Sequence, residues 1–363
     1  MMIPYEDLAR LNEPFNEAFE IKFKEVVKKG WLILGQEVKD FEAEFAAFHL
    51  EEYCVGVANG LDALILSLKA LAFPPGSEVI VPSNTYIATI LAILHAGHTP
   101  VLVEPNISTY NIDPAKIEEA ITIKTKAIMV VHLYGKCCDM DPIIAIQKKY
   151  SLALIEDCAQ AHDAKYKGKL AGTFGDAGCF SFYPTKNLGA LGDAGAVICA
   201  NPDIAAYLKK TRNYGSEVKY HNDIVGYNSR LDEVQAAFLR IKLGHLGAIT
   251  AHKRKLASLY HQYLKDDFIK PVVGSEYFDV YHIYNIRHKK RDELKAYLLK
   301  NEIVTEIHYP VAPHHQKALQ GILDPASRFP VSQEIHDTTL SIPCSFCHTE
   351  DEILHVIEVL NKF

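Results

Sequence analysis

Three short segments of the sequence combine residue types that can do chemistry. The first is residues 58–62, in which Asn59 and Gly60 form a turn just before a helical pattern. A glycine there lets a ligand approach the backbone, and the free N–H groups and the positive end of the helix dipole suit a phosphate. Asn-Gly also forms ordinary turns, so this segment alone leaves both interpretations open.

The second segment ends a strongly apolar run. Residues 152–155 lead directly into Glu156 and Asp157, so at least one carboxylate must lie at the end of a buried strand. Burial of a carboxylate is costly unless a cation faces it. The protonated ring nitrogen of a cofactor would supply that cation for Asp157, although an aspartate at this position could also cap a helix.

Lys186 is the central residue of the third segment. In residues 179–195 an apolar strand ends near Pro184, the lysine follows, and three glycines bracket a tight loop. Most lysines are solvated surface charges, but the neighbours of Lys186 are apolar or small. We therefore interpret it as a lysine with a lowered pKa that forms an imine. A phosphate seat, a carboxylate for a ring nitrogen and such a lysine together describe a site for pyridoxal 5′-phosphate (PLP).

The elements that must position these segments belong to an α/β sheet. From residue 54 to about residue 204, short apolar runs alternate with helical patterns, which predicts a mostly parallel central sheet of six or seven strands flanked by helices. Sheets of this kind bind ligands beyond the carboxyl ends of their strands, where all three segments fall. The predicted strands are residues 54–57, 79–81, 100–103, 127–131, 152–155, 179–182 and 196–199.

The rest of the chain predicts a second, smaller α+β domain. We place the large domain, with its N-terminal arm, at residues 1–245 and the small C-terminal domain at residues 246–363. We expect Lys253, Arg254 and Lys255 to form a solvated helix face. The pattern predicts strands at residues 280–287 and 304–308 and helices at residues 231–245, 249–264, 292–301 and 350–361.

Composition and charge limit the classes of function that we expect for this protein. The 363 residues carry 38 Lys and Arg against 45 Asp and Glu, a net charge of -7, so the chain has no basic excess with which to bind nucleic acid. No apolar run approaches the roughly 18 residues of a membrane span, and the N-terminus has no secretory pattern. We therefore expect a cytoplasmic enzyme that acts on a small molecule, with neither a membrane nor a nucleic acid as partner.

Two local motifs could suggest other chemistry. Cys344, Cys347 and His348 match the C-x-x-C-H spacing of haem attachment, and the two cysteines match a dithiol pair, but the N-terminus argues against export. We interpret them as ordinary cysteines in a loop before the last helix. The histidine-rich stretch of residues 308–316 has no recognised metal-ligand spacing, so we predict no metal.

Several motifs resemble the DegT/StrS family of sugar aminotransferases, a branch of the fold-type I aminotransferases. Residues 181–189, SFYPTKNLG, are similar to the family's lysine signature, and residues 226–232, GYNSRLD, are similar to a second hallmark. The resemblance extends from residues 30–35 through residues 308–310 to the C-terminus. It implies the fold of that class, a large PLP-binding α/β domain with a smaller C-terminal α+β domain.

The resemblance also implies a role for each matching residue. Lys186 would bind PLP covalently and then move the proton, and Asp157 would pair with the ring nitrogen. Leu61 stands where the family usually has Thr or Ser, so it would offer the phosphate only its backbone N–H. The other implied contacts are Gln160 near the phenolic oxygen, Tyr86 stacked on the ring, Asn59, Gly60 and Ser181 at the phosphate, and Asn228 from a neighbouring subunit. The active sites would therefore be shared within a homodimer.

The resemblance is strongest to family members that aminate C-3 of a dTDP-linked 3-keto-6-deoxyhexose in deoxyamino-sugar biosynthesis. The expected partners are therefore a nucleotide-linked keto-sugar and an amino donor, glutamate. Asp163 stands where a glycine is commoner, which alters the shape expected beside the sugar pocket. Contacts with the substrate are implied for His162, Tyr183, His308, Tyr309 and His314.

Three alternative functions stay open at this stage. The chain could aminate a 4-keto sugar instead. It could be a PLP-dependent sugar dehydratase, although those relatives replace the imine lysine by histidine, which Lys186 argues against. It could also be a regulatory homologue that binds the cofactor or a nucleotide-sugar without catalysis. The presence of Lys186, Asp157 and Gln160 favours an enzyme.

Overall fold

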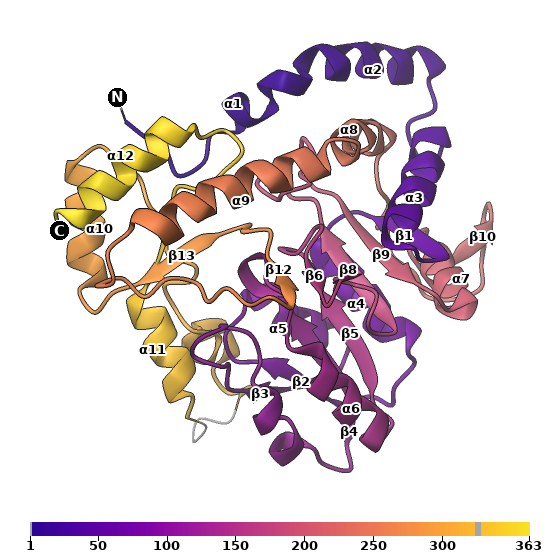
Figure 1. Cartoon of the computed structure of the whole chain (residues 1–363). Coiled ribbons are helices and arrows are strands. Elements are labelled where there is room, and N and C mark those ends of the chain that lie inside the picture. The colour runs from indigo at the N-terminus through magenta and orange to yellow at the C-terminus, as the bar shows by residue number, and fades with distance from the viewer. Residues whose placement is uncertain (1, 324–327) are drawn as a thin grey trace.

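A seven-stranded sheet forms the centre of the molecule (Figure 1). The computed structural model describes residues 2–323 and 328–363, and the strand order within them is β1-β9-β8-β5-β4-β2-β3. Neighbouring strands are parallel except that β9 is antiparallel to both β1 and β8. The predicted sheet is therefore confirmed. Its strands are β1 Tyr53–Val57, β2 Glu78–Pro82, β3 Thr99–Val103, β4 Thr125–Val131, β5 Ala153–Asp157, β8 Ala177–Ser181 and β9 Gly195–Cys199.

Helices cover both faces of this sheet because both faces are apolar. Alternate strand residues enter two separate hydrophobic clusters, as the two-residue period of a strand requires. One cluster contains residues of α3, α6 and α8, and the other contains residues of α4, α5 and α7. These helices are α3 Gln36–His49, α4 Gly60–Ala70, α5 Ile87–His95, α6 Met140–Tyr150, α7 Pro202–Thr211 and α8 Glu233–Leu243.

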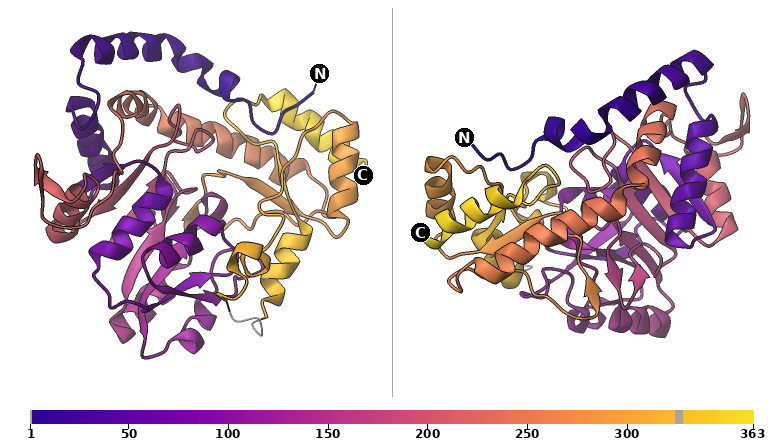
Figure 2. Two further views of the ribbon diagram at one scale, coloured as in Figure 1. Left: turned by 180° about the vertical axis from the view of Figure 1, so that it is seen from behind. Right: turned by 45° about the horizontal axis from the view of Figure 1, so that its top comes forward.

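A third hydrophobic cluster holds the C-terminal part together. Ile3 also belongs to this cluster and pairs with Ile303, so the N-terminal end of the chain lies beside α12 (Figures 1 and 2). The helix α8 ends at Leu243, and α9 begins at Leu246. A domain division at residue 245 stays a prediction. The elements of this cluster are α9 Leu246–Tyr263, β13 Tyr284–Arg287, α10 Arg291–Lys300, β14 Thr339–Ile342 and α12 Glu350–Asn361.

The remaining elements are short. The helix α11, Pro330–Thr338, precedes β14. No helix among the described residues is both long and apolar enough to cross a membrane. Two small sheets pair β10 Ser216–Val218 with β11 His221–Asn222, and β6 Lys165–Tyr166 with β7 Lys169–Leu170 and β12 Tyr277–Phe278.

One predicted strand is shorter in the structure, and another is not formed. The strand predicted at residues 280–287 begins only at Tyr284, because the positive φ of 46° at Tyr281 interrupts the extended backbone. Residues 304–308 form no strand; they contribute an isolated bridge between Glu306 and Ser341. Most of residues 280–287 are buried, whereas only Thr305 is buried in 304–308. An apolar pattern alone does not select extended structure.

The basic run on α9 is not a solvated face either. Lys253 is 3% exposed, and its Nζ donates a hydrogen bond to the carbonyl oxygen of His282 at 3.3 Å. Arg254 Nη1 donates to the carbonyl oxygen of Asp279 at 2.6 Å. Lys255 is the exposed member of the run. The two inward cations therefore fix the segment that precedes β13.

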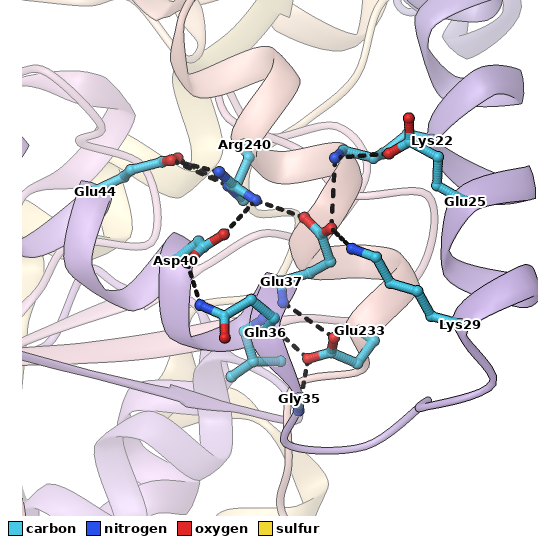
Figure 3. Close-up of polar contacts among 11 residues, drawn as sticks. Lys22, Glu25, Lys29, Gly35, Gln36, Glu37, Asp40, Glu44, Glu233 and Arg240 are labelled. Atoms are coloured by element: carbon cyan, nitrogen blue, oxygen red, sulfur yellow. Dashed lines mark hydrogen bonds and ion pairs between the residues drawn. The ribbon is translucent and has the colours of Figure 1, made fainter.

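The N-terminal arm lies against α8 through buried charge. It contains α1, Leu8–Asn12, and α2, Asn16–Lys29 (Figure 1). The carboxylate of Glu37 accepts hydrogen bonds from Lys22 at 3.4 Å, Lys29 at 3.3 Å and Arg240 at 2.6 Å (Figure 3). Burial opposes ionisation of Glu37, but these cations outweigh it and lower the pKa of that carboxyl.

A second carboxylate caps α3 in the same region. Glu233 accepts hydrogen bonds from the backbone N–H groups of Gly35 at 2.8 Å, Glu37 at 3.0 Å and Val38 at 2.9 Å (Figure 3). These groups have no partner inside the helix, and a negative charge there also suits the helix dipole. Glu233 thus joins the start of α3 to the start of α8.

Candidate active site

An open cavity of about 630 Å³ lies at the carboxyl ends of β1, β4, β5 and β8. This is the edge at which the sequence predicted a ligand. The cavity brings together most of the predicted site residues, although these residues are far apart in the sequence. Those that line it are Asn59, Gly60, Leu61, Tyr86, Asp157, Gln160, Ser181, Tyr183, Lys186, His308 and Tyr309.

Lys186 extends into this cavity from a tight loop after β8. Its backbone N–H donates to the carbonyl oxygen of Tyr183 at 2.8 Å, and its Nζ lies 3.5 Å from Nε2 of His282. Burial lowers the pKa of the amine to about 8, while attraction to Asp157 acts in the opposite direction. A larger share of Lys186 is therefore a free, nucleophilic amine near neutral pH than for an exposed lysine.

Asp157 ends β5 on the floor of the cavity and is 6% exposed. One carboxylate oxygen accepts from Thr89 Oγ1 at 2.8 Å, and the other accepts from the backbone N–H of Ala159 at 3.1 Å. Burial raises the pKa of Asp157, and these two hydrogen bonds partly oppose that shift. A carboxylate oxygen has two lone pairs, so Asp157 can accept a further N–H from a cationic ring.

Thr89 was missed at the sequence level. Its hydroxyl hydrogen-bonds to that of Thr85 at 2.8 Å as well as to Asp157, and both threonines are 1% exposed. Apart from Thr89 and His95, the residues of α5 are apolar. A threonine in the first turn of such a helix gives no recognisable motif, so only the fold reveals that it faces Asp157.

The turn at Asn59 and Gly60 packs closely on the end of β8. A Cβ atom added to Gly60 would lie 2.5 Å from the Cβ of Ser181, so only glycine fits there. The side-chain oxygen of Asn59 accepts from the backbone N–H of Asp62 at 2.8 Å and thereby caps α4. The helix start, the serine and the glycine fit a phosphate, and together with Lys186 the residues fit PLP.

Two tyrosines and a glutamine form another wall. Gln160 accepts from the backbone N–H of Tyr134 at 2.6 Å and donates from Nε2 to the hydroxyl of Tyr309 at 3.0 Å. The rings of Tyr86 and Tyr309 are 5.2 Å apart. Gln160 is thus fixed at both ends, and two aromatic faces are available beside the predicted position of the cofactor ring.

Three predicted site residues do not line the cavity. His162 is buried in the core, with its ring 5.5 Å from each of the rings of Phe180 and Phe182. His314 packs its ring 5.0 Å from that of Phe329, outside the cavity wall. Asn228 is exposed. His162 and His314 therefore lie outside this cavity, and their contacts with a sugar stay predictions. Asn228 was assigned to the site of a neighbouring subunit.

Asp163 keeps the backbone expected of the commoner glycine. Its φ is 68°, in the left-handed region that favours glycine, although aspartate is also tolerated there. Its carboxylate pairs with Lys165 Nζ at 3.3 Å. The backbone at Asp163 is therefore one that a glycine also adopts readily.

A buried histidine and a buried glutamate near Asp157 are spaced like metal ligands. The glutamate oxygens, however, already accept a full set of hydrogen bonds. His132, Glu156 and Cys158 place their ligand atoms within 4.8 Å of one another. His132 Nε2 lies 2.8 Å from the carboxylate of Glu156. That carboxylate also accepts backbone N–H groups of Gly172 at 2.8 Å, Phe174 at 2.6 Å and Gly175 at 2.8 Å. Four hydrogen bonds fill its lone pairs, so it orders the loops around Asp157.

The C-x-x-C-H motif has a structural explanation. Cys344 and Cys347 are free, buried thiols in the loop between β14 and α12, which confirms the predicted loop. His348 accepts from the backbone N–H of Ser345 at 2.9 Å through Nδ1, and its Nε2 lies 2.8 Å from the carbonyl oxygen of Pro4. The motif therefore ties the N-terminal end of the chain to the C-terminal part.

Comparison with known proteins identifies the family of this chain. Residues 15–361 match the model of the DegT/DnrJ/EryC1/StrS aminotransferase family. The chain belongs to this family. It is accordingly an aminotransferase with a fold shared across the whole chain, as the motifs around Lys186 predicted.

Curated relatives match over their full length. The dTDP-3-amino-3,6-dideoxy-alpha-D-galactopyranose transaminase of Aneurinibacillus thermoaerophilus is 50% identical over 100% of this chain and 99% of its own. The dTDP-3-amino-3,4,6-trideoxy-alpha-D-glucose transaminase of Streptomyces venezuelae is 40% identical over 99% and 96%. A UDP-N-acetyl-3-dehydro-alpha-D-glucosamine 3-aminotransferase of Acidithiobacillus ferrooxidans is 40% identical over 99% and 97%.

Solved structures agree with the family assignment. DesV of S. venezuelae, solved in complex with a ketimine intermediate, superposes with a TM-score of 0.97 at 40% identity and covers 99% of this chain and 98% of its own. NtdA of Bacillus subtilis, solved with the bound cofactor PMP, has a TM-score of 0.91 at 31% identity and covers 99% and 84%.

Proposed function

We propose that this aminotransferase uses PLP to move an amino group from glutamate to the C-3 keto group of a dTDP-linked 3-keto-6-deoxyhexose. The cofactor assignment rests on one observation: the Lys186 amine and the Asp157 carboxylate lie in the same cavity. The substrate assignment rests on the names of the relatives. Amination at C-3 has broader support than the nucleotide, because the A. ferrooxidans relative is named for a 3-amino transfer on a UDP-sugar.

Each residue contributes to this reaction through its position. PLP, when bound, supplies an aldehyde that reacts with amines and a ring that accepts electrons. Lys186 holds the cofactor through its amine and, once released, carries the proton during amino transfer. Asp157 stays ionised and accepts the ring N–H, which keeps that nitrogen protonated. Gly60 and Ser181 bind the phosphate at the start of α4.

Other residues orient the ring and the sugar. Tyr86 would stack on the cofactor ring. Gln160, fixed by Tyr134 and Tyr309, would hydrogen-bond to the phenolic oxygen. Tyr183 is 52% exposed and lies at the rim. Together with His308 and Tyr309, it is placed to contact a bulky nucleotide-sugar.

The proposed working unit is a homodimer with shared active sites. Trp31 and Leu32 are 66% and 52% exposed, although both are large apolar side chains. A second copy of the chain that covers this region would bury them. Asn228, exposed in the single chain, would then reach the phosphate of the other subunit.

The test separates the two half-reactions. Glutamate is added to the PLP-loaded enzyme, and the change in cofactor absorbance is followed. The aminated cofactor form is then offered 3-keto and 4-keto sugars linked to dTDP or UDP, with product detected by mass spectrometry. We expect the dTDP-linked 3-keto sugar to react fastest and Lys186→Ala to be inactive. Preference for a 4-keto sugar, or no reaction with glutamate, would contradict the proposal and favour the C-4 enzyme or the regulator.

A further inference from the structure

A short segment just before β13 is fixed in place behind the catalytic lysine. Val280 donates its backbone N–H to the carbonyl oxygen of Gly135 at 2.9 Å, and its own carbonyl accepts from Asn187 Nδ2 at 3.1 Å. Lys253 Nζ donates to the carbonyl oxygen of His282 at 3.3 Å. A Cβ on Gly135 would lie 2.8 Å from the backbone nitrogen of His282. The main chain at His282 is therefore held on several sides.

The side chain of His282 enters the cavity from this segment. Its Nε2 lies 3.5 Å from Lys186 Nζ, and its buried Nδ1 has no hydrogen-bond partner among the described residues. Burial and the nearby charge of Lys186 keep the pKa of the imidazole well below its ordinary value. The ring is therefore neutral, so Nε2 can accept a hydrogen bond from an ammonium group, which can only donate.

We propose that His282 is a positioning residue for the amine of Lys186. Its neutral ring accepts a hydrogen bond from Nζ and holds the amine in the cavity while the amine is not covalently bound to the cofactor. This inference rests on the proposed role of Lys186 as the residue that binds PLP. Because an acceptor stabilises the ammonium form more than the free amine, the contact also adjusts how readily Lys186 takes up and releases its proton.

Among the described residues, the other ionisable groups around the amine make no hydrogen bond with Nζ. Asp157 attracts the amine from the end of β5. Burial lowers the pKa of His162 to about 3 and that of His308 to about 4, so both rings are neutral near pH 7. Lys253 lies behind the segment and bonds to its main chain. Within the described residues, the side-chain hydrogen bond of Nζ is the one to His282.

The test measures the amine itself in the cofactor-free enzyme. Acetylation of Lys186 by acetic anhydride, quantified by peptide mass spectrometry over a pH series, gives its pKa without any catalytic turnover. We expect His282→Leu to lower that pKa by about one unit, the size expected for loss of one hydrogen bond to a charged group. His282→Gln, whose amide oxygen extends as far as Nε2, should restore it to within a few tenths of a unit.

A second buried histidine provides a matched control. His49 makes its hydrogen bond at Nδ1 with the carbonyl oxygen of Phe45 at 2.9 Å, so His49→Leu should leave the pKa of Lys186 unchanged. If His282→Leu does not fold, His282→Asn, whose amide is too short to reach Nζ, replaces it in the comparison with His282→Gln.

Two results would overturn the proposal: equal pKa values in the wild type and every His282 variant, or a fall in His282→Gln as large as that in His282→Leu. Failure of the proposed function would look different. It would appear as amino transfer that persists in Lys186→Ala, whatever the acetylation experiment shows.

Discussion

At the residue scale, the site joins an amine and a carboxylate that burial affects in opposite senses. Burial lowers the pKa of Lys186 to about 8, and it raises the pKa of Asp157. Both shifts favour the neutral form of the group. Asp157 counters its shift with hydrogen bonds from Thr89 and Ala159, so it can remain ionised once a cationic ring faces it.

Asp157→Asn tests this carboxylate. The amide keeps the size of the side chain but loses the charge that holds the ring nitrogen protonated. Removal of one partner of a buried charge pair costs about 3–5 kcal/mol, so the rate of amino transfer from glutamate should fall about a hundredfold to five-thousandfold. Stopped-flow absorbance measures this rate. A decrease of less than about threefold would show that Asp157 does not face the ring.

The sequence identified these two residues for a chemical reason. Lys186 and Asp157 are ionisable groups next to apolar strands. A charge buried in such a place is costly unless it has a partner. Thr89 and His282 gave no such indication, because a threonine in a buried helix and a histidine in an apolar run are ordinary core residues. Their roles depend on contacts with Asp157 and Lys186 that only the folded chain creates.

At the element scale, the start of α3 depends on one side chain from another helix. Glu233 is 3% exposed and accepts three backbone N–H groups at that end. We expect Glu233→Ala to lower the free energy of unfolding by about 2–4 kcal/mol, because these donors then lose their partner. Glu233→Gln, which keeps one acceptor oxygen, should cost about half as much.

Urea unfolding of the two Glu233 variants measures these changes. The control is Glu17→Ala, on the exposed face of α2, which should change the free energy of unfolding by less than about 0.5 kcal/mol. A similarly small change in Glu233→Ala would contradict the capping role.

The buried Lys242 on α8 predicts a pH dependence of stability. Its side chain is fully buried, and its Nζ donates to Asn12 Oδ1 at 3.2 Å. Burial lowers the pKa of the amine from an ordinary 10.5 to about 8, against the attraction of Glu6. Between these two pH values the unfolded chain keeps a proton that the folded chain has lost, so this lysine makes stability rise with pH.

Lys242→Met removes that contribution. The free energy of unfolding of the wild type, minus that of the variant, should increase as the pH is raised from about 8 to about 10.5. Chemical unfolding at several pH values measures both. A difference that stays constant over this range would show that the pKa of Lys242 is not lowered in the folded chain.

Element boundaries were predicted well where the period was regular and poorly elsewhere. The alternation of strands and helices from β1 to β9 follows from apolar runs that only a two-faced sheet can bury. The positive φ at Tyr281 ends the extended backbone before β13, and no sequence pattern indicated it. That departure is next to His282, which lines the cavity.

At the scale of the whole molecule, the proposed homodimer makes the active site incomplete in one chain. Asn228 lies outside the cavity of its own chain, while Lys186 lines it. Mixing the variants Lys186→Ala and Asn228→Ala tests whether the two residues act in different subunits. A mixed dimer would contain one site with an intact Lys186 and an intact Asn228 from the other subunit.

The mixture should therefore regain activity that neither variant has alone, up to about a quarter of the wild-type value after random exchange between symmetric dimers. Each variant is first measured by itself for amino transfer from glutamate. The proteins are then mixed in equal amounts under conditions that allow subunits to exchange. Activity equal to the mean of the two separate variants would place Asn228 in the same chain as its site, or outside it.

The overall architecture followed from the sequence because apolar periodicity and the family motifs extend over nearly the whole chain. What the sequence did not reveal is how the two ends meet. Ile3 joins the C-terminal hydrophobic cluster, and His348 bonds to the backbone at Pro4. Contacts between residues so far apart in the sequence leave no local pattern.

The most direct test of the account is to locate the cofactor on the chain. Borohydride reduction of the PLP-loaded enzyme makes an imine bond permanent, and peptide mass spectrometry then identifies the modified lysine. We predict a single modified residue, Lys186, and loss of the modification in Lys186→Ala. Modification of a different lysine in the wild type, or none at all, would contradict the central claim that this amine holds the cofactor opposite Asp157.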